Sequence, residues 1–101
     1  MNIYEERLLE TFEKESRKLN ELKHEYEQAK LDLSTRKIDL KYTKFADIKT
    51  IKEREERATL EVKDDADALL LLKKDVSDQQ LVVDVVRLEV EMYTHTKGTT
   101  D

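Results

Sequence analysis

The chain has no cysteine and no proline, and its single glycine, Gly98, lies near the C-terminus. The lack of cysteine excludes disulfides and thiolate metal sites and fits a reducing compartment. Disordered linkers are usually rich in glycine and proline, so their scarcity argues against disorder. No apolar run approaches the roughly 20 residues needed to cross a bilayer. The first residues, MNIYEERLLE, lack the features of a signal peptide. We therefore expect a cytoplasmic protein with no membrane partner.

The composition is that of long amphipathic helices. Charged residues make up 43% of the chain and hydrophobic residues 38%, a balance that compact globular domains rarely show. At 101 residues the chain is most simply one domain, and long helices of this size bury a thin seam instead of a thick core. We therefore expect oligomers.

Charge is distributed unevenly along the chain. Residues 1–57 carry fourteen Lys/Arg and fourteen Asp/Glu, whereas residues 58–101 carry five and ten. The interval from Arg36 to Lys52 is locally basic. The net charge of −5 therefore comes from the C-terminal half.

Two heptad patterns predict a coiled coil. The first consists of Phe12, Leu19, Tyr26, Leu33 and Leu40, with companions Leu8, Leu22 and Ala29. The second consists of Val62, Leu69, Val76, Val83 and Val90, with companions Leu72, Val86 and Tyr93. Glu15 and Arg36 fall on companion positions of the first pattern, where we expect interrupted packing or polar pairs across the coil. We expect these seams to hold an oligomer together.

The sequence predicts an all-α, long-helix antiparallel coiled-coil hairpin over residues 1–94, followed by a frayed tail at 95–101. Asn2 with Glu5 resembles an N-cap for a helix that reaches at least Leu33. Three places compete for the turn. Thr50 and Glu53 form a possible capping box at the end of Thr43–Thr50, the aspartates of Lys63–Asp67 favour turns and N-caps, and Ser77 with Gln80 forms another possible capping box. We favour a break near 44–50 and a weaker one near 63–65, with a C-terminal helix from about Asp65 to Thr94.

A strand interpretation competes in two segments. Val86, Leu88, Val90 and Met92 alternate with charged residues, and Ile38, Leu40 and Tyr42 do the same. No glycine, proline or Asn-Gly turn signal flanks either segment, so helices are favoured. The interval from Leu81 to Met92 is apolar on more than one face, which predicts three or more helices around it.

Catalytic and metal-binding patterns are weak. Glu21 and His24 have the E-x-x-H spacing of di-iron bundles, but a matching second pair is missing, so we interpret them as a solvated helix face. The cluster of Asp64, Asp65 and Asp67 lacks the glycine and glutamate of a calcium loop. We interpret it as the first turn of a helix, where carboxylates are favourable. No phosphate-binding glycine loop occurs. We expect no enzyme, no cofactor, no metal and no small-molecule substrate.

The basic stretch is a candidate surface for single-stranded DNA. Lys37, Lys41 and Lys44 share one helical face, and Tyr42 and Phe45 lie next to them. Lysines that neutralise phosphates beside aromatics that stack on bases are typical of single-strand binding. The alternative is that these lysines pair with acids of a neighbouring subunit.

Three segments carry a resemblance to a known family: EYEQAKLDLSTRKIDL, KEREERATLEVKDDADALLLL and VVRLEVEMYTHTK. Over roughly residues 20–97 the chain resembles small phage recombination mediators of the UvsY type. The resemblance implies a small, helical, non-enzymatic oligomer that loads a recombinase on single-stranded DNA. It makes Lys37, Lys41 and Lys44 the positions for DNA contact, and the acidic C-terminal half is a departure from that role.

The functional hypothesis is a non-enzymatic coiled-coil interaction protein, most concretely a phage-type recombination accessory. Its partners would be itself, a second protein and single-stranded DNA, in the host cytoplasm if the chain is phage-encoded. One alternative is a small acidic phage-encoded inhibitor, comparable to anti-CRISPR proteins, that docks on a host nuclease or defence complex. Another is a purely structural scaffold.

Overall fold

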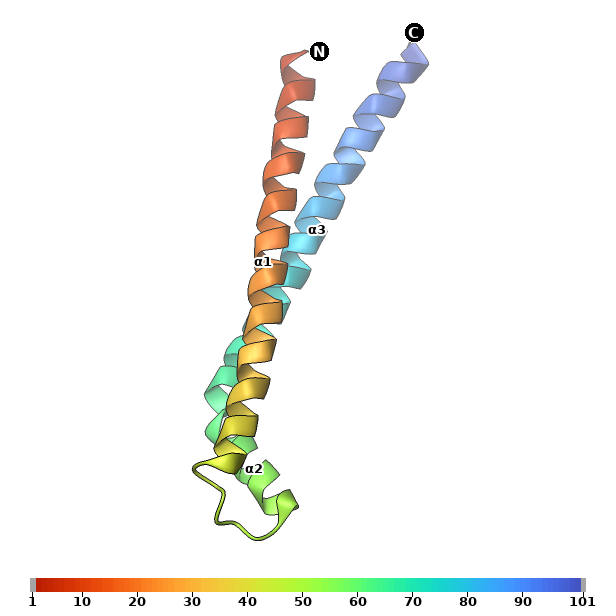
Figure 1. Cartoon of the computed structure of the whole chain (residues 1–101). Helices are drawn as coiled ribbons and strands as arrows, with labels where there is room; N and C mark the ends of the chain where they lie inside the picture. Colours follow the sequence, from red (N-terminus) through yellow and green to blue (C-terminus); the bar gives the residue numbers. More distant parts are fainter. Residues whose placement is uncertain (1, 101) are drawn as a thin grey trace. The chain divides into compact units, whose positions relative to one another are not determined.

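The structure is a computed structural model that describes residues 2–100, with side chains described for residues 2–95. It consists of three helices in the order α1 (Ile3–Tyr42), α2 (Ile51–Glu61) and α3 (Lys63–Thr100), which Figure 1 follows along the chain. No strand occurs between residues 2 and 100. The predicted all-α, long-helix hairpin is therefore confirmed, and the strand alternative for Val86–Met92 is wrong. Val83, Val86 and Val90 also fit a helical spacing, and the burial of Val83 and Val86 favours it.

The predicted capping residues begin two of the helices. The Asn2 side-chain oxygen accepts the Glu5 backbone N–H at 2.8 Å. Thr50 is the N-cap of α2, and its hydroxyl accepts the Glu53 N–H at 3.3 Å. In both cases a side-chain oxygen satisfies an N–H that has no partner within the helix. Ser77 and Gln80, the third candidate break, lie inside α3.

The connection between α1 and α2 turns without glycine or proline. After Tyr42, the Phe45 N–H reaches back to the Leu40 carbonyl at 2.9 Å, and the Thr43 hydroxyl donates to the Asp39 carbonyl at 2.9 Å. The Ile48 N–H closes a further turn onto the Phe45 carbonyl at 3.2 Å. No described residue has a positive φ, so ordinary residues suffice for these turns.

The junction between α2 and α3 is a single residue. Val62 has φ −99° and ψ 15°, and its N–H still bonds to the Ala58 carbonyl. Asp64 and Asp65 stand in the first turn of α3, where carboxylates interact favourably with the helix dipole. The second interruption thus lies just before the expected interval of 63–65. α3 is helical as far as Thr100, and the side chains of the predicted tail beyond His95 lie outside the described residues.

Contacts group the chain into two compact units. The terminal unit comprises residues 1–23 and 74–101, and the loop unit comprises residues 24–73. In the terminal unit α1 and α3 are antiparallel, because Tyr4 contacts Tyr93 whereas Glu15 contacts Gln79. In the loop unit the C-terminal part of α1, α2 and the first turns of α3 pack together.

The heptad residues form the seam of each unit within one chain. In the terminal unit Leu19 and Val83 are only 5% and 2% exposed. In the loop unit Ala58 and Val62 are almost fully buried. The remaining heptad residues that we expected in the seam are buried or half-buried: Leu8, Phe12, Leu22, Tyr26, Ala29, Leu33, Leu40, Leu69, Leu72, Val76, Val86, Val90 and Tyr93. Their participation in an oligomer stays a prediction.

Polar pairs replace apolar packing at both flaws in the first heptad pattern. In the terminal unit the Gln79 amide, which is 6% exposed, donates to the Glu15 carbonyl at 3.0 Å and to the Glu15 carboxylate at 2.6 Å. In the loop unit Arg36 forms an ion pair with Asp65. The expectation of polar pairs across the coil is therefore confirmed, with both partners on the same chain. Gln79 is buried, so a slip of the register would leave its amide without an acceptor. The Arg36–Asp65 pair is half exposed to water and constrains the register less.

We predict that replacing Glu15 and Gln79 together by leucine raises stability and loosens the register. Replacing a buried ion pair with well-packed apolar residues is often neutral or stabilises a protein by about 1–4 kcal/mol. Because Gln79 is neutral and Glu15 is only half-buried, we expect a gain of about 1 kcal/mol. Chemical denaturation would measure the free energy of unfolding, and spin labels at Lys18 and Asp75 would measure the distance distribution between α1 and α3. A lower free energy of unfolding, or an unbroadened distance distribution, would contradict the register role.

Candidate functional surfaces

The three lysines of the predicted DNA surface lie in the loop unit and form ion pairs with α2. The Lys37 ammonium lies 2.8 Å from one carboxylate oxygen of Glu55, and Lys41 pairs with the other oxygen. The Lys44 ammonium lies 2.7 Å from Glu61. Lys37 and Lys41 lie one turn apart on α1, as the spacing predicts, whereas Lys44 lies in the loop beyond the end of α1 at Tyr42. The expectation that all three lysines share one helical face is therefore wrong for Lys44, because the helix ends before it. Two carboxylates of the same chain thus contact the three ammonium groups and offset part of their charge.

The two aromatic residues of the predicted DNA surface have different environments. Tyr42, the last residue of α1, is 76% exposed. Phe45 is half-buried in the loop, and the Lys44 ammonium lies 5.6 Å from the centre of its ring. A base could therefore stack on Tyr42, whereas Phe45 already contacts a cation. DNA binding by these residues stays a prediction.

The lysines change the acidity of their partners. Hydrogen bonds from Lys37 and then Lys41 lower the pKa of the Glu55 carboxyl to about 2. The hydrogen bond from Lys44 lowers the pKa of Glu61 in the same way. A charged donor favours the ionised form of the carboxyl that it contacts. The pairs of Glu55 therefore attach α2 to α1, and the pair of Glu61 attaches α2 to the loop, most firmly when both carboxyls are ionised.

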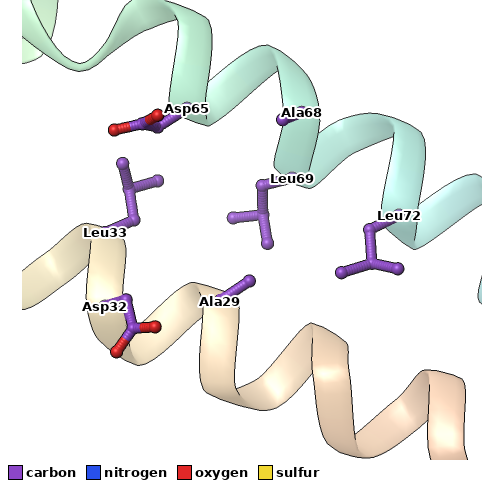
Figure 2. A pocket seen from close by; sticks show the side chains of 7 residues that line it. All are labelled: Ala29, Asp32, Leu33, Asp65, Ala68, Leu69 and Leu72. Atoms are coloured by element: carbon purple, nitrogen blue, oxygen red, sulfur yellow. The ribbon is translucent and has the colours of Figure 1, made fainter.

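The loop unit has an apolar groove between α1 and α3, shown in Figure 2. Leu33, Leu69 and Leu72 point into the groove, and Asp32 and Asp65 lie at one end of it. Its volume is about 250 Å³. Ala29 and Ala68 also line it, and their short side chains leave space between the helices. Ligand pockets usually measure roughly 300–1,000 Å³ and enclose most of their ligand, so we interpret this groove as incomplete packing.

The terminal unit has a second groove, with a volume of about 360 Å³. Leu22 of α1 and Val82 of α3 form its apolar part. Asp75, Asp78 and Gln79 of α3 and Lys18 of α1 form its polar part. The groove therefore lies between α1 and α3 and has both an apolar and a charged part.

A row of exposed apolar side chains lies on α3 in the terminal unit. Leu81, Val85, Leu88 and Met92 are 64%, 54%, 57% and 67% exposed. Their spacing of four, three and four residues places them on one side of the helix. We call these four residues the α3 outer row. The sequence indicated that this segment is apolar on more than one face, but it did not show which residues α1 would leave uncovered.

Among the described residues, the fold brings no further metal-binding side chains to the weak patterns found in the sequence. Glu21 and His24 are exposed on α1. Among the side chains at residues 2–95, no group of three or more histidine or acidic residues has the arrangement of a metal site. The Asp64 and Asp65 carboxylates belong to the first turn of α3, as the helix-start interpretation predicts.

We predict that acidification weakens the attachment of α2 to α1. Because the pKa of Glu55 is lowered in the folded chain, its stabilising effect is present above the ordinary pKa of 4.5 and is lost as pH falls toward about 2. Melting followed by circular dichroism should show the melting temperature falling across this interval, and Glu55→Gln should reduce the fall. Glu56→Gln, which changes the neighbouring exposed carboxylate, is the matched control. Equal pH dependence in both variants would contradict the assignment.

Comparison with known proteins gives no relative from which a function could be transferred. No family model, curated protein or solved structure matches the chain. None of the described helices combines the length and apolar character that crossing a bilayer requires. The resemblance to recombination mediators stays a prediction.

Proposed function

We propose that this chain is a non-enzymatic interaction protein that binds another protein helix through the α3 outer row. The row is the observation that carries the proposal. In the terminal unit α1 covers the seam side of α3 and leaves the row uncovered, so the row is available to a second protein. We predicted additional helices around Leu81–Met92 for the same reason, because one neighbouring helix cannot cover both apolar faces of this segment.

The energetics favour a binding role for the row. Covering the exposed part of each of the four side chains would contribute about 1–2 kcal/mol. A contiguous apolar surface of this kind, with polar residues beside it, is typical of an interaction site. Four such residues on one helix, with Leu88 near their centre, are enough to anchor a partner helix in the mode that amphipathic helices use.

Direct binding of single-stranded DNA has less support than binding of protein. Lys37, Lys41 and Lys44 each contact a carboxylate, so a phosphate would have to displace Glu55 or Glu61. The recombination accessory and the acidic inhibitor both remain within the proposed class, since each must bind another protein. They differ in whether DNA is also a ligand.

The DNA question has a direct measurement. Anisotropy of a labelled single-stranded oligonucleotide should change little at moderate salt, because the three lysines are already paired. Saturable binding that weakens with salt and is lost when Lys37, Lys41 and Lys44 become glutamine would instead support the mediator hypothesis. Circular dichroism of that variant would establish that the helices remain folded.

We predict that Leu88→Gln abolishes association without unfolding the chain. Leu31→Gln is the matched control, because Leu31 is 59% exposed on α1 and Leu88 is 57% exposed on α3. Sedimentation velocity over a range of concentrations measures self-association. A photoreactive amino acid at position 85 or at position 31 measures contact with a partner in cells. Each variant should melt within a few degrees of the parent chain.

The expected result is association, with itself or with one partner, that depends on Leu88 and not on Leu31, and crosslinking at position 85 and not at 31. A chain that stays monomeric and crosslinks nothing at position 85 would contradict the proposed function. So would association to which Leu88 and Leu31 contribute equally.

A further inference from the structure

Acidic side chains border the α3 outer row on both sides. At 100° per residue, Asp78 and Glu89 fall on one flank of the row, and Asp84 and Glu91 fall on the other. Asp78, Glu89 and Glu91 are exposed, and Asp84 is half-buried. The row is therefore an apolar strip between two lines of carboxylates.

Little positive charge on α3 offsets these carboxylates. Between residues 74 and 94, the α3 part of the terminal unit up to Thr94, the chain has five acidic residues against two basic ones, Lys74 and Arg87. Lys74 lies two turns before Leu81, so it precedes the row. The Arg87 guanidinium lies 3.6 Å from Asp84 and 5.9 Å from the centre of the Phe12 ring, so it is turned toward α1. The α1 part of the terminal unit is nearly neutral, with six acidic and five basic residues in positions 1–23. The acidic bias thus belongs to the side of α3 that carries the row.

The groove of the terminal unit continues this surface along one flank. Asp78, which borders the row, also lines the groove together with Asp75 and the apolar Val82. Val82 is 42% exposed, so it extends the apolar surface toward Leu22 of α1. A helix laid on the row would meet carboxylates on both sides and a further apolar depression on one.

We infer that the occupant of this face is a basic amphipathic helix of another protein, an inference that rests on the proposed function. Its apolar side chains would cover the α3 outer row, and its lysines or arginines would meet the two lines of carboxylates. A second copy of this chain is disfavoured, because pairing the face with itself would bring the carboxylates of both copies together. Like charges at the flanks of a coiled coil select against that pairing.

The test uses the whole chain and synthetic helical peptides on the order of 20 residues. One peptide has leucines along one face, a single tryptophan among them, and lysines on both flanks. A second replaces every lysine with glutamate, and a third scrambles the first so that its charge is kept and its apolar face is lost. The chain contains no tryptophan, so tryptophan fluorescence reports only on the peptide.

The lysine peptide should bind with a blue-shifted tryptophan emission, and at least about tenfold more tightly than the other two peptides. Glu89→Gln with Glu91→Gln should weaken this binding roughly five- to tenfold. Glu21→Gln with Glu25→Gln, the matched change on exposed positions of α1, should leave it within about twofold. Leu88→Gln should abolish it.

Several results would contradict the inference. They would not affect the proposed function, which the association and crosslinking experiments test separately. Equal binding of the lysine and glutamate peptides would show that the carboxylates do not select the partner. Equal binding of the scrambled peptide would show attraction by charge alone. Failure of all three peptides, together with self-association that depends on Leu88, would identify a second copy as the occupant. Melting temperatures of the variants would establish that each compared chain is folded.

Discussion

The contact of α1 with α3 along a narrow apolar seam within each unit is the constraint on which the other features depend. A pair of helices has no interior beyond the side chains that meet between them, so each helix keeps most of its circumference in water. This explains why the chain is so highly charged and why few residues are fully buried. It also explains why polar pairs within the seam matter. Leu19 and Val83 could pack in neighbouring registers, whereas Gln79 with Glu15 satisfies its hydrogen bonds in one.

The sequence predicted the structure best where the outcome depends only on residues close together in the chain. Heptad spacing identified which side of α1 and α3 faces inward, and the side chains of Asn2 and Thr50 marked where two helices begin. It also indicated that Glu15 and Arg36 would interrupt apolar packing. In each case the signal depends on residues within one or two turns, and helical geometry converts it directly into a position.

The partners of these residues required the fold. A heptad pattern indicates that a helix has an apolar side, but it does not indicate whether the facing helix belongs to the same chain. Lys37 and Lys41 were expected on one face, yet Glu55 became their partner only because the loop returns α2 onto α1. The exposure of Leu88 has the same cause, because sequence shows that a segment is apolar on two sides but not which side the neighbouring helix covers. These are consequences of tertiary contact, which spacing along the chain does not encode.

The loop at residues 43–50 has a different kind of role from the helices that it joins. It contributes few buried side chains, and its main physical effect is to keep α1 near α2 and α3 at an effective concentration of order millimolar. The specificity of the pairing belongs to the seam and to the contact of Gln79 with Glu15. α1 and the segment that contains α2 and α3 therefore behave as two polypeptides that the loop connects. Supplied as two polypeptides, residues 1–42 and 51–101 would retain every contact of the seam and would become a heterodimer whose assembly depends on concentration.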